Sequence, residues 1–221
     1  MFTQTWFEDL AKHNFEKIKI EYHPISFLEI GCYEGNCHLY MYQTILTHPE
    51  SRSTVIDPFG RGTGSSLHEN KLELFKHNLK DYLSRIIIYN NLTNEILPTL
   101  TDMYDIIYVD GDHSAVQTYI DGIHGWKLLK KDGIMIFDDY KWHGVRKQHT
   151  WPQGMAIGEY NHPAKGVNNF LKQIEGEYTL FGKKDGFDLD CKIIDLNRLE
   201  EDEYIKELET YNYQIWIKKI V

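Results

Sequence analysis

The sequence is poor in cysteine and has no long hydrophobic run. Its three cysteines are Cys32, Cys37 and Cys191. Their odd number and irregular spacing fit no zinc pattern, so we expect reduced, buried thiols rather than a disulfide framework. No apolar stretch approaches the roughly 18 residues of a membrane span, and the first residues are too polar for a signal peptide. We therefore expect a soluble, cytoplasmic protein that does not bind a membrane.

Positive charge is also scarce. The chain has 24 Lys and Arg residues against 33 Asp and Glu residues, a formal net charge of -9 at pH 7. Such a field repels polyanions unless a local basic stripe intervenes. The lysines are scattered or lie next to acidic residues, so we expect no nucleic-acid partner.

The composition is that of a folded protein of ordinary size. Of the 221 residues, 42% are hydrophobic and 26% are charged, which suits a single domain over residues 1–221 with a sizeable core. The sequence predicts a helical N-terminal extension over residues 1–24 with an apolar face, which we expect to pack on the body or on a partner subunit in a homodimer. The apolar residues of this extension are Trp6, Phe7, Leu10, Phe15 and Ile18.

Short apolar runs alternate with helical patterns along the chain. The runs are nearly continuous in apolar residues, as in parallel strands buried on both faces. They cover residues 26–31, 53–59, 85–90, 105–111 and 133–140. Helical periodicity appears over residues 67–83, 114–131 and 163–175. This order predicts a doubly wound α/β fold. Two further strands, 178–184 and 213–220, would bring the sheet to seven, with an acidic helix or loop between them.

The first predicted strand runs into the glycine turn "LEIGCYEGN". It places Glu29 two residues before Gly31, and Gly35 four residues after that glycine. Ligands of this fold class bind outside the carboxyl ends of the strands, where glycines let a ligand approach the backbone. The spacing is not the dinucleotide fingerprint G-x-G-x-x-G, which disfavours a nicotinamide oxidoreductase. The acid suits a cationic amine or sulfonium ligand better than a pyrophosphate.

Polar residues also follow the second and third predicted strands. Asp57 stands where a carboxylate can bind both hydroxyls of a ribose, and Asn90 and Asn91 stand where side chains can line a base pocket. Alternatively, the glycines merely shape a tight turn and Asp57 caps the next element. Three such features at consecutive strand ends favour ligand binding.

Two acidic clusters follow the fourth and fifth predicted strands. Asp110, Asp112 and His113 form one, and Asp138 and Asp139 form the other. Such aspartates can simply cap a helix or face solvent. Converging carboxylates, however, are costly without a cation. A hard divalent ion, Mg²⁺ or a similar cation, offsets that cost with oxygen ligands.

The motifs "LEIGCYEGN", "VIDPFG", "YVDGDHS" and "DGIMIFDDY" resemble the class I S-adenosylmethionine-dependent methyltransferases. More narrowly, they resemble the metal-dependent, macrocin-type O-methyltransferases that modify sugar hydroxyls. The resemblance covers about residues 26–175. It implies a Rossmann-like, seven-stranded, mostly parallel sheet whose last strand is antiparallel.

The resemblance also implies roles for individual residues. S-adenosylmethionine would bind at the strand ends from Glu29 to Asp110. The metal ligands would be Asp110, Asp138 and Asp139. Asp139 departs from the asparagine of catechol-type enzymes and matches the sugar-modifying branch, whereas His113 replaces the lysine of the catechol type. We expect Asp112 to be the catalytic base, with His113 as the second candidate.

The segment 141–162 is long for a connection and rich in aromatic residues and histidine. Long loops in compact domains are often lids, so we expect a lid or acceptor-binding loop here, or a dimer contact. Two alternatives to a sugar O-methyltransferase stay open from the sequence. The acceptor is a phenol or another small metabolite, or the chain is a non-catalytic nucleotide-binding module.

Overall fold

The computed structural model describes residues 2–19, 21–60, 70–142, 162–185, 191, 193 and 213–221. Within them a seven-stranded sheet has the order β3-β2-β1-β4-β5-β7-β6. The strands are β1 Ser26–Ile30, β2 Arg52–Ile56, β3 Ile86–Tyr89, β4 Tyr104–Val109, β5 Leu129–Phe137, β6 Tyr178–Leu180 and β7 Ile215–Lys219. The first five are parallel, and β7 runs antiparallel to both β5 and β6. This confirms the predicted Rossmann-like sheet with an antiparallel last strand.

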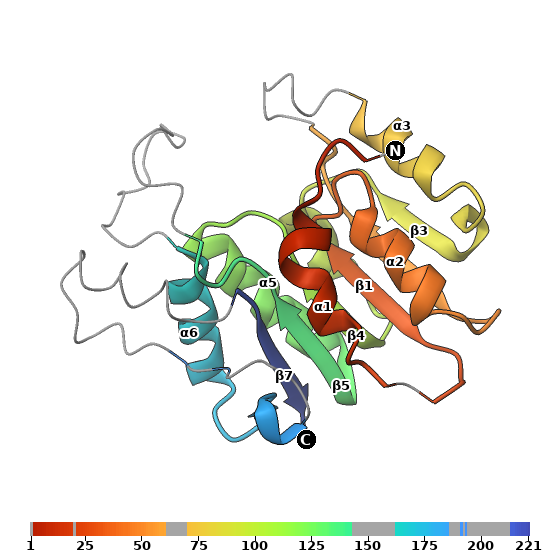
Figure 1. The fold of residues 1–221 in the computed structure, drawn as a ribbon. Helices are drawn as coiled ribbons and strands as arrows, with labels where there is room; N and C mark the ends of the chain where they lie inside the picture. Colours follow the sequence, from red (N-terminus) through yellow and green to blue (C-terminus); the bar gives the residue numbers. More distant parts are fainter. Residues whose placement is uncertain are drawn as a thin grey trace, which may run out of the picture.

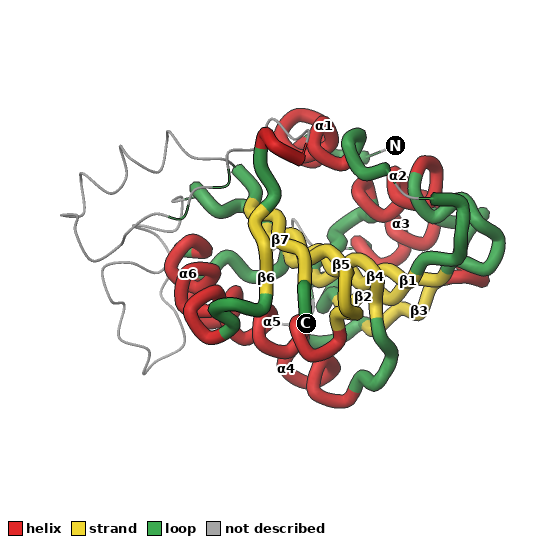
Figure 2. Tube along the Cα trace, turned by 90° about the horizontal axis from the view of Figure 1, so that it is seen from below, coloured by secondary structure: helices red, strands yellow, loops and turns green. Residues whose placement is uncertain are grey.

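Helices cover both faces of the sheet. They are α1 Lys12–Phe15, α2 Asn36–Thr44, α3 Lys71–Asn78, α4 Thr93–Ile96, α5 Ala115–Leu128 and α6 Pro163–Gln173. Viewed along the sheet, α1 to α3 lie on one face and α4 to α6 on the other (Figures 1 and 2). None of the helices in these described stretches has the length and apolar character that a bilayer crossing requires.

The N-terminal extension packs on the body, as one of the two predicted arrangements has it. A π-helical turn, Phe7–Ala11, precedes α1. Phe15 is buried, and its ring lies 5.3 Å from that of Tyr108 in β4 and 5.0 Å from that of Trp216 in β7. Phe7 and Phe15 of the extension therefore belong to the core of the fold, whereas Trp6 and Leu10 of its predicted apolar face are exposed.

One predicted boundary is wrong. The sequence predicts a helix over residues 114–131 and a strand from residue 133, but α5 ends at Leu128 and β5 begins at Leu129. Leu129 is fully buried and pairs with Tyr104. The register then shifts between Tyr104 and Ile106, and Asp132 has a positive φ of 63°. A β-bulge thus accommodates Lys130, Lys131 and Asp132 within the strand, although polar residues of this kind are typical of a turn.

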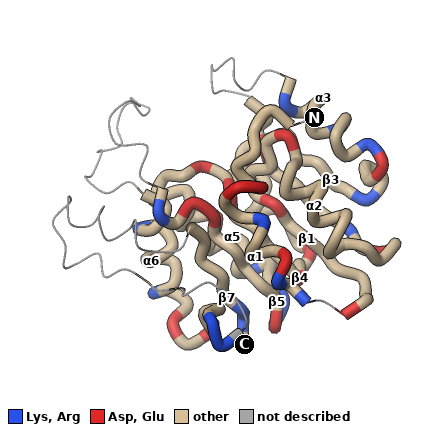
Figure 3. Tube along the Cα trace, viewed as in Figure 1, with Lys and Arg blue, Asp and Glu red and all other residues tan. Residues whose placement is uncertain are grey.

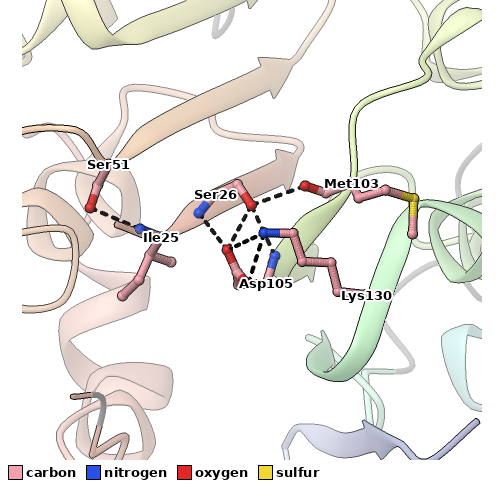
Figure 4. A network of polar contacts seen from close by, with 6 residues as sticks. All are labelled: Ile25, Ser26, Ser51, Met103, Asp105 and Lys130. Carbon is pink, nitrogen blue, oxygen red and sulfur yellow. Dashed lines mark hydrogen bonds and ion pairs between the residues drawn. The ribbon is translucent and has the colours of Figure 1, made fainter. Parts of the chain in front are cut away.

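A polar network ties the strands together at the amino edge of the sheet (Figure 4). Asp105 accepts hydrogen bonds from the backbone N–H and the hydroxyl of Ser26, both at 2.7 Å. Lys130 pairs with the same carboxylate at 2.9 Å. These contacts hold β1, β4 and β5 in register at the edge opposite the predicted site.

Candidate functional site

The residues predicted from the sequence lie side by side at the carboxyl edge of the sheet. The first residue after each strand continues the backbone ladder of its neighbour. The N–H groups of Asp57, Gly31, Asp110 and Asp138 donate to the carbonyls of Tyr89, Ile56, Ile30 and Val109 at 3.1, 2.9, 2.8 and 3.0 Å. The edge therefore presents the glycine turn between Asp57 and the two acidic clusters.

Gly31 is required by the packing of this edge. Its φ is +78°, and a Cβ at this position would lie 2.1 Å from the backbone oxygen of Asp110. Only a glycine lets the turn after β1 lie against the turn after β4. Gly35, the second glycine of the motif, has a φ of +82° and precedes α2.

Asp57 holds the glycine turn in place. One carboxylate oxygen accepts the N–H groups of Cys32 and Tyr33, each at 2.8 Å, and the other accepts that of Phe59 at 2.5 Å. A carboxylate has about four acceptor positions, and three are taken here, so about one is left for a ribose hydroxyl. Ribose binding by Asp57 stays a prediction.

Glu29 lies beneath the turn and is only 1% exposed. Its carboxylate is 2.6 Å from Nδ1 of His38, whose other nitrogen is 2.7 Å from the hydroxyl of Ser53. Burial raises the pKa of Glu29, and His38 opposes that rise. The pair with His38 accounts for Glu29 without a ligand, so its assignment to the donor also stays a prediction.

The N-terminal segment binds the glycine turn through Glu34, a contact that the sequence did not reveal. The carboxylate of Glu34 accepts the backbone N–H of Thr3 at 2.7 Å and lies 2.5 Å from Nζ of Lys71. Lys71 also lies over the ring of Tyr33, 4.2 Å from its centroid. The partners are 31 and 37 residues away in the chain, so no local pattern marks this buried ion pair.

Asn90 is exposed, and Asn91 accepts the N–H of Leu92 at 3.0 Å. Their place around a base stays a prediction.

A polar network that the sequence did not reveal lies beyond these two asparagines. The amide of Gln117 in α5 donates to Thr93, Asn94 and Asp121, all within 3.0 Å. Gln117 thus links α4, which follows β3, to α5, which follows the first acidic cluster.

Asp121 of this network gives a prediction on stability. It is 1% exposed, and burial raises its pKa to about 7. The unfolded chain loses this proton near pH 4, so stability falls as pH rises from about 4 to 7, by up to about 4 kcal/mol. Asp121→Asn keeps an oxygen for Gln117 and removes the charge. We expect the variant to unfold in urea at higher concentration than wild type at pH 8, with a much smaller difference at pH 5. Equal pH dependence in both proteins would contradict this assignment.

The structure brings together Asp110, His113 and Asp139. One ligand atom from each lies within 4.8 Å of the others. Nδ1 of His113 is 3.3 Å from Oδ2 of Asp139. His113 was predicted as a possible base, and here it stands among potential metal ligands.

Asp138 does not belong to this group of three. One of its oxygens accepts a hydrogen bond from the hydroxyl of Tyr108, and its Oδ1 is buried with no hydrogen-bond partner among the described residues. The hydroxyl of Tyr213, just before β7, donates in the same way to Oδ1 of Asp139. Two tyrosines thus orient the two neighbouring carboxylates.

The electrostatics of the cluster favour a cation. Burial, followed by the charges of Asp138 and Asp139, raises the pKa of Asp110 well above its usual range. Burial and the charge of Asp139 raise the pKa of Asp138 to about 7. A divalent cation offers a partner to the buried oxygen of Asp138. Its positive charge also stabilises the ionised forms of Asp110 and Asp138, which burial and neighbouring charges disfavour. The donor set therefore fits a metal.

Asp112 is exposed and helps to begin α5. Its Oδ1 accepts the N–H of Ser114 at 2.7 Å, and the hydroxyl of Ser114 accepts the N–H of Gln117 at 3.2 Å. Ser114 is thus the N-cap of α5, and Asp112 supports this cap, in line with the capping alternative given for these aspartates. A role for Asp112 as base stays a prediction.

Of the predicted loop 141–162, residues 143–161 lie outside the described residues. Trp142 at its start is half-buried, and its ring centroid lies 4.8 Å from that of His113. In the described part of the chain, lysine and arginine are spread over several elements rather than gathered in one stripe (Figure 3).

The chain is similar in sequence or in fold to several known proteins. An uncharacterized protein of Acanthamoeba polyphaga mimivirus is 29% identical over 136 residues, which are 61% of this chain and 57% of that protein. An O-methyltransferase of Aspergillus hancockii is 28% identical over 90 residues, which are 38% of this chain and 34% of that protein. The chain thus matches only about half, or less, of the length of these relatives.

A solved O-methyltransferase from Bacillus cereus, in complex with SAH, shares the fold. Its TM-score is 0.54 at 14% identity, and the alignment covers 100% of this chain and 92% of that chain. The model of one family, described as a methyltransferase domain, matches residues 28–140, about half of the chain. This match begins within β1 and ends just after the Asp138–Asp139 pair, so it spans the whole edge described above. The chain therefore belongs to the methyltransferase-domain family.

Proposed function

We propose that the protein transfers a methyl group from S-adenosylmethionine to a hydroxyl of a sugar or glycan, with a divalent cation held at the acidic clusters. The observation that carries this proposal is the row of strand ends. It sets the glycine turn, where a donor binds in this fold, directly beside Asp110, and Asp110 in turn lies beside Asp139. A donor and an acceptor bound at this edge would be neighbours.

The proposed donor site is the turn from Gly31 to Gly35 together with Asp57. The fold binds ligands at this switch point, and the related O-methyltransferase from Bacillus cereus was solved in complex with SAH. Asn90 and Asn91 are the proposed residues around the base. The tie between Glu34 and the N-terminal segment fixes the turn in a defined conformation before a donor arrives.

The proposed cation site is formed by Asp110 and Asp139, which lie together, and by Asp138, whose buried Oδ1 has no hydrogen-bond partner among the described residues. When bound there, a divalent cation would supply positive charge that lowers the pKa of a nearby acceptor hydroxyl. Asp112 takes the hydroxyl proton. The acceptor oxygen then forms a bond to the methyl carbon, and the bond between that carbon and sulfur breaks with its electron pair left on sulfur. The protein contributes mainly by holding the two reactants in line.

The proposal of a sugar as the acceptor rests on two residues, Asp139 and Trp142. Asp139 distinguishes the sugar-modifying branch that the motifs resemble. The ring of Trp142, beside His113 at the rim of the cluster, offers an apolar surface against which the face of a sugar ring packs.

Labelled methyl transfer tests the proposal. The protein is incubated with labelled S-adenosylmethionine and a panel of sugars, glycans and catechols, with Mg²⁺ or with EDTA. We expect label on a sugar and its loss in EDTA. Label only on catechols would overturn the acceptor class, and transfer that EDTA leaves unchanged would overturn the role of the cation.

The base is tested by Asp112→Asn. Asparagine still accepts the N–H of Ser114 through its side-chain oxygen, so folding is preserved while proton acceptance is lost. We expect unchanged binding of S-adenosylhomocysteine by calorimetry and turnover lowered by about a hundredfold or more. Turnover at the wild-type rate would move the base to another group.

A further inference from the structure

We propose that His113 is a ligand of the cation, so that this site prefers a first-row transition-metal ion such as Mn²⁺ to Mg²⁺. The inference rests on the proposed function, because it concerns the same site. It adds a nitrogen to the oxygen ligands expected from the sequence.

The distances suit a shared ion. Ligand atoms bonded to one cation at about 2.0–2.2 Å lie roughly 3–4 Å from one another. Nδ1 of His113 and Oδ2 of Asp139 are already 3.3 Å apart, and the atoms of the three residues lie within 4.8 Å. A contraction of less than about 1 Å therefore brings the group to coordination distances.

The surrounding contacts hold His113 and Asp139 in this arrangement. Tyr213 occupies Oδ1 of Asp139, which leaves Oδ2 on the side of His113. The ring of Trp142 packs against the imidazole, and the hydrogen bond from Ser114 to Asp112 fixes the turn that carries it. His113 is one-third exposed, with a side-chain exposure of 33%, so an ion can reach it from solvent.

The chemistry of the ligand set decides the metal. Mg²⁺ is bound by oxygen ligands and keeps several waters, whereas imidazole nitrogen suits first-row transition metals. The imidazole of His113 turns the three carboxylates of the proposed site into a mixed oxygen and nitrogen set, for which affinity rises from Mn²⁺ toward later metals. Nδ1 of His113 faces the carboxylate of Asp139 at 3.3 Å, so this nitrogen is directed toward one of the proposed metal ligands.

The test loads the protein with Mn²⁺ and measures nitrogen coupling by pulsed electron paramagnetic resonance, with no donor or acceptor present. The same samples yield Kd for Mn²⁺ and, by competition, for Mg²⁺. The variants are His113→Gln and, as a control for the loss of one imidazole, His124→Gln. His124 lies far along α5, outside the group of three.

We expect nitrogen coupling in the wild type and in His124→Gln, with Mn²⁺ bound at least about tenfold more tightly than Mg²⁺. In His113→Gln the coupling should disappear and the preference should fall below about threefold. If His113→Gln folds poorly, the wild-type protein still tests the proposal. Labelling its histidines with ¹⁵N changes the nitrogen coupling if a histidine binds Mn²⁺.

The outcomes separate this inference from the proposed function. Cation binding without nitrogen coupling, or coupling that persists in His113→Gln, overturns the role of His113 and leaves the methyltransferase proposal standing. If no cation binds while S-adenosylhomocysteine does, both the ligand role and the metal-dependent mechanism are overturned.

Discussion

Asp110→Asn is expected to lower methyl transfer by about a thousandfold. Asp110 lies between the glycine turn and the second acidic cluster, within 4.8 Å of the ligand atoms of His113 and Asp139. Asparagine preserves the shape and removes the negative charge, so it weakens cation binding. The measurement is labelled transfer at saturating donor, with the cation affinity taken alongside.

Asp105→Asn is the matched control for this variant. Asp105 belongs to β4, the strand that Asp110 follows, but lies at the opposite edge of the sheet, where it pairs with Lys130. We expect this substitution to lower stability and to leave the rate per folded molecule close to wild type. If Asp110→Asn retained the wild-type rate, or if Asp105→Asn reduced it equally, the placement of the reaction at the carboxyl edge would be wrong.

Gly31→Ala is expected to destabilise the protein by about 4 kcal/mol or more, or to prevent folding. A left-handed backbone costs a non-glycine residue about 1–2 kcal/mol, and overpacking adds about 1–3 kcal/mol or more. Here the added Cβ would lie 2.1 Å from the backbone oxygen of Asp110, and a backbone cannot yield as a side-chain tip does. Chemical denaturation followed by circular dichroism measures the loss.

Gly176→Ala separates the two costs. Gly176 has a similar φ of +85°, but a Cβ there would meet nothing within 4 Å. This variant should lose only about 1–2 kcal/mol. Equal losses at the two positions would show that the close approach of the two turns adds nothing to the need for glycine at position 31.

The strands and their order were predictable because the core strands are apolar and short. Their ends could be aligned from the parallel order alone, which placed Asp57, Gly31, Asp110 and Asp138 at one edge. The start of β5 was not predictable, because Leu129 and the bulge at Asp132 depend on pairing with Tyr104. Local sequence there resembles the end of a helix.

The side-chain arrangement of the site was only partly predictable. Adjacent residues alternate in direction, so a pair such as Asp138–Asp139 does not reveal which carboxylate faces His113. That choice is set by Tyr108 and Tyr213, which come from β4 and from the segment before β7. The ion pair of Glu34 and the burial of Asp121 likewise depend on partners distant in sequence or on packing.

The support of the acidic edge by β7 has a consequence for how the fold is assembled. Gln214 accepts a hydrogen bond from Asn14 of α1 across 200 residues, and Tyr213 reaches Asp139 across 74. Closing such long loops costs chain entropy before it yields contacts, so these pairings slow folding rather than begin it. The sheet from β1 to β5 can form around shorter-range pairings, whereas the edge is completed only when the antiparallel strand docks. A ligand bound there consequently stabilises the closure of nearly the whole chain.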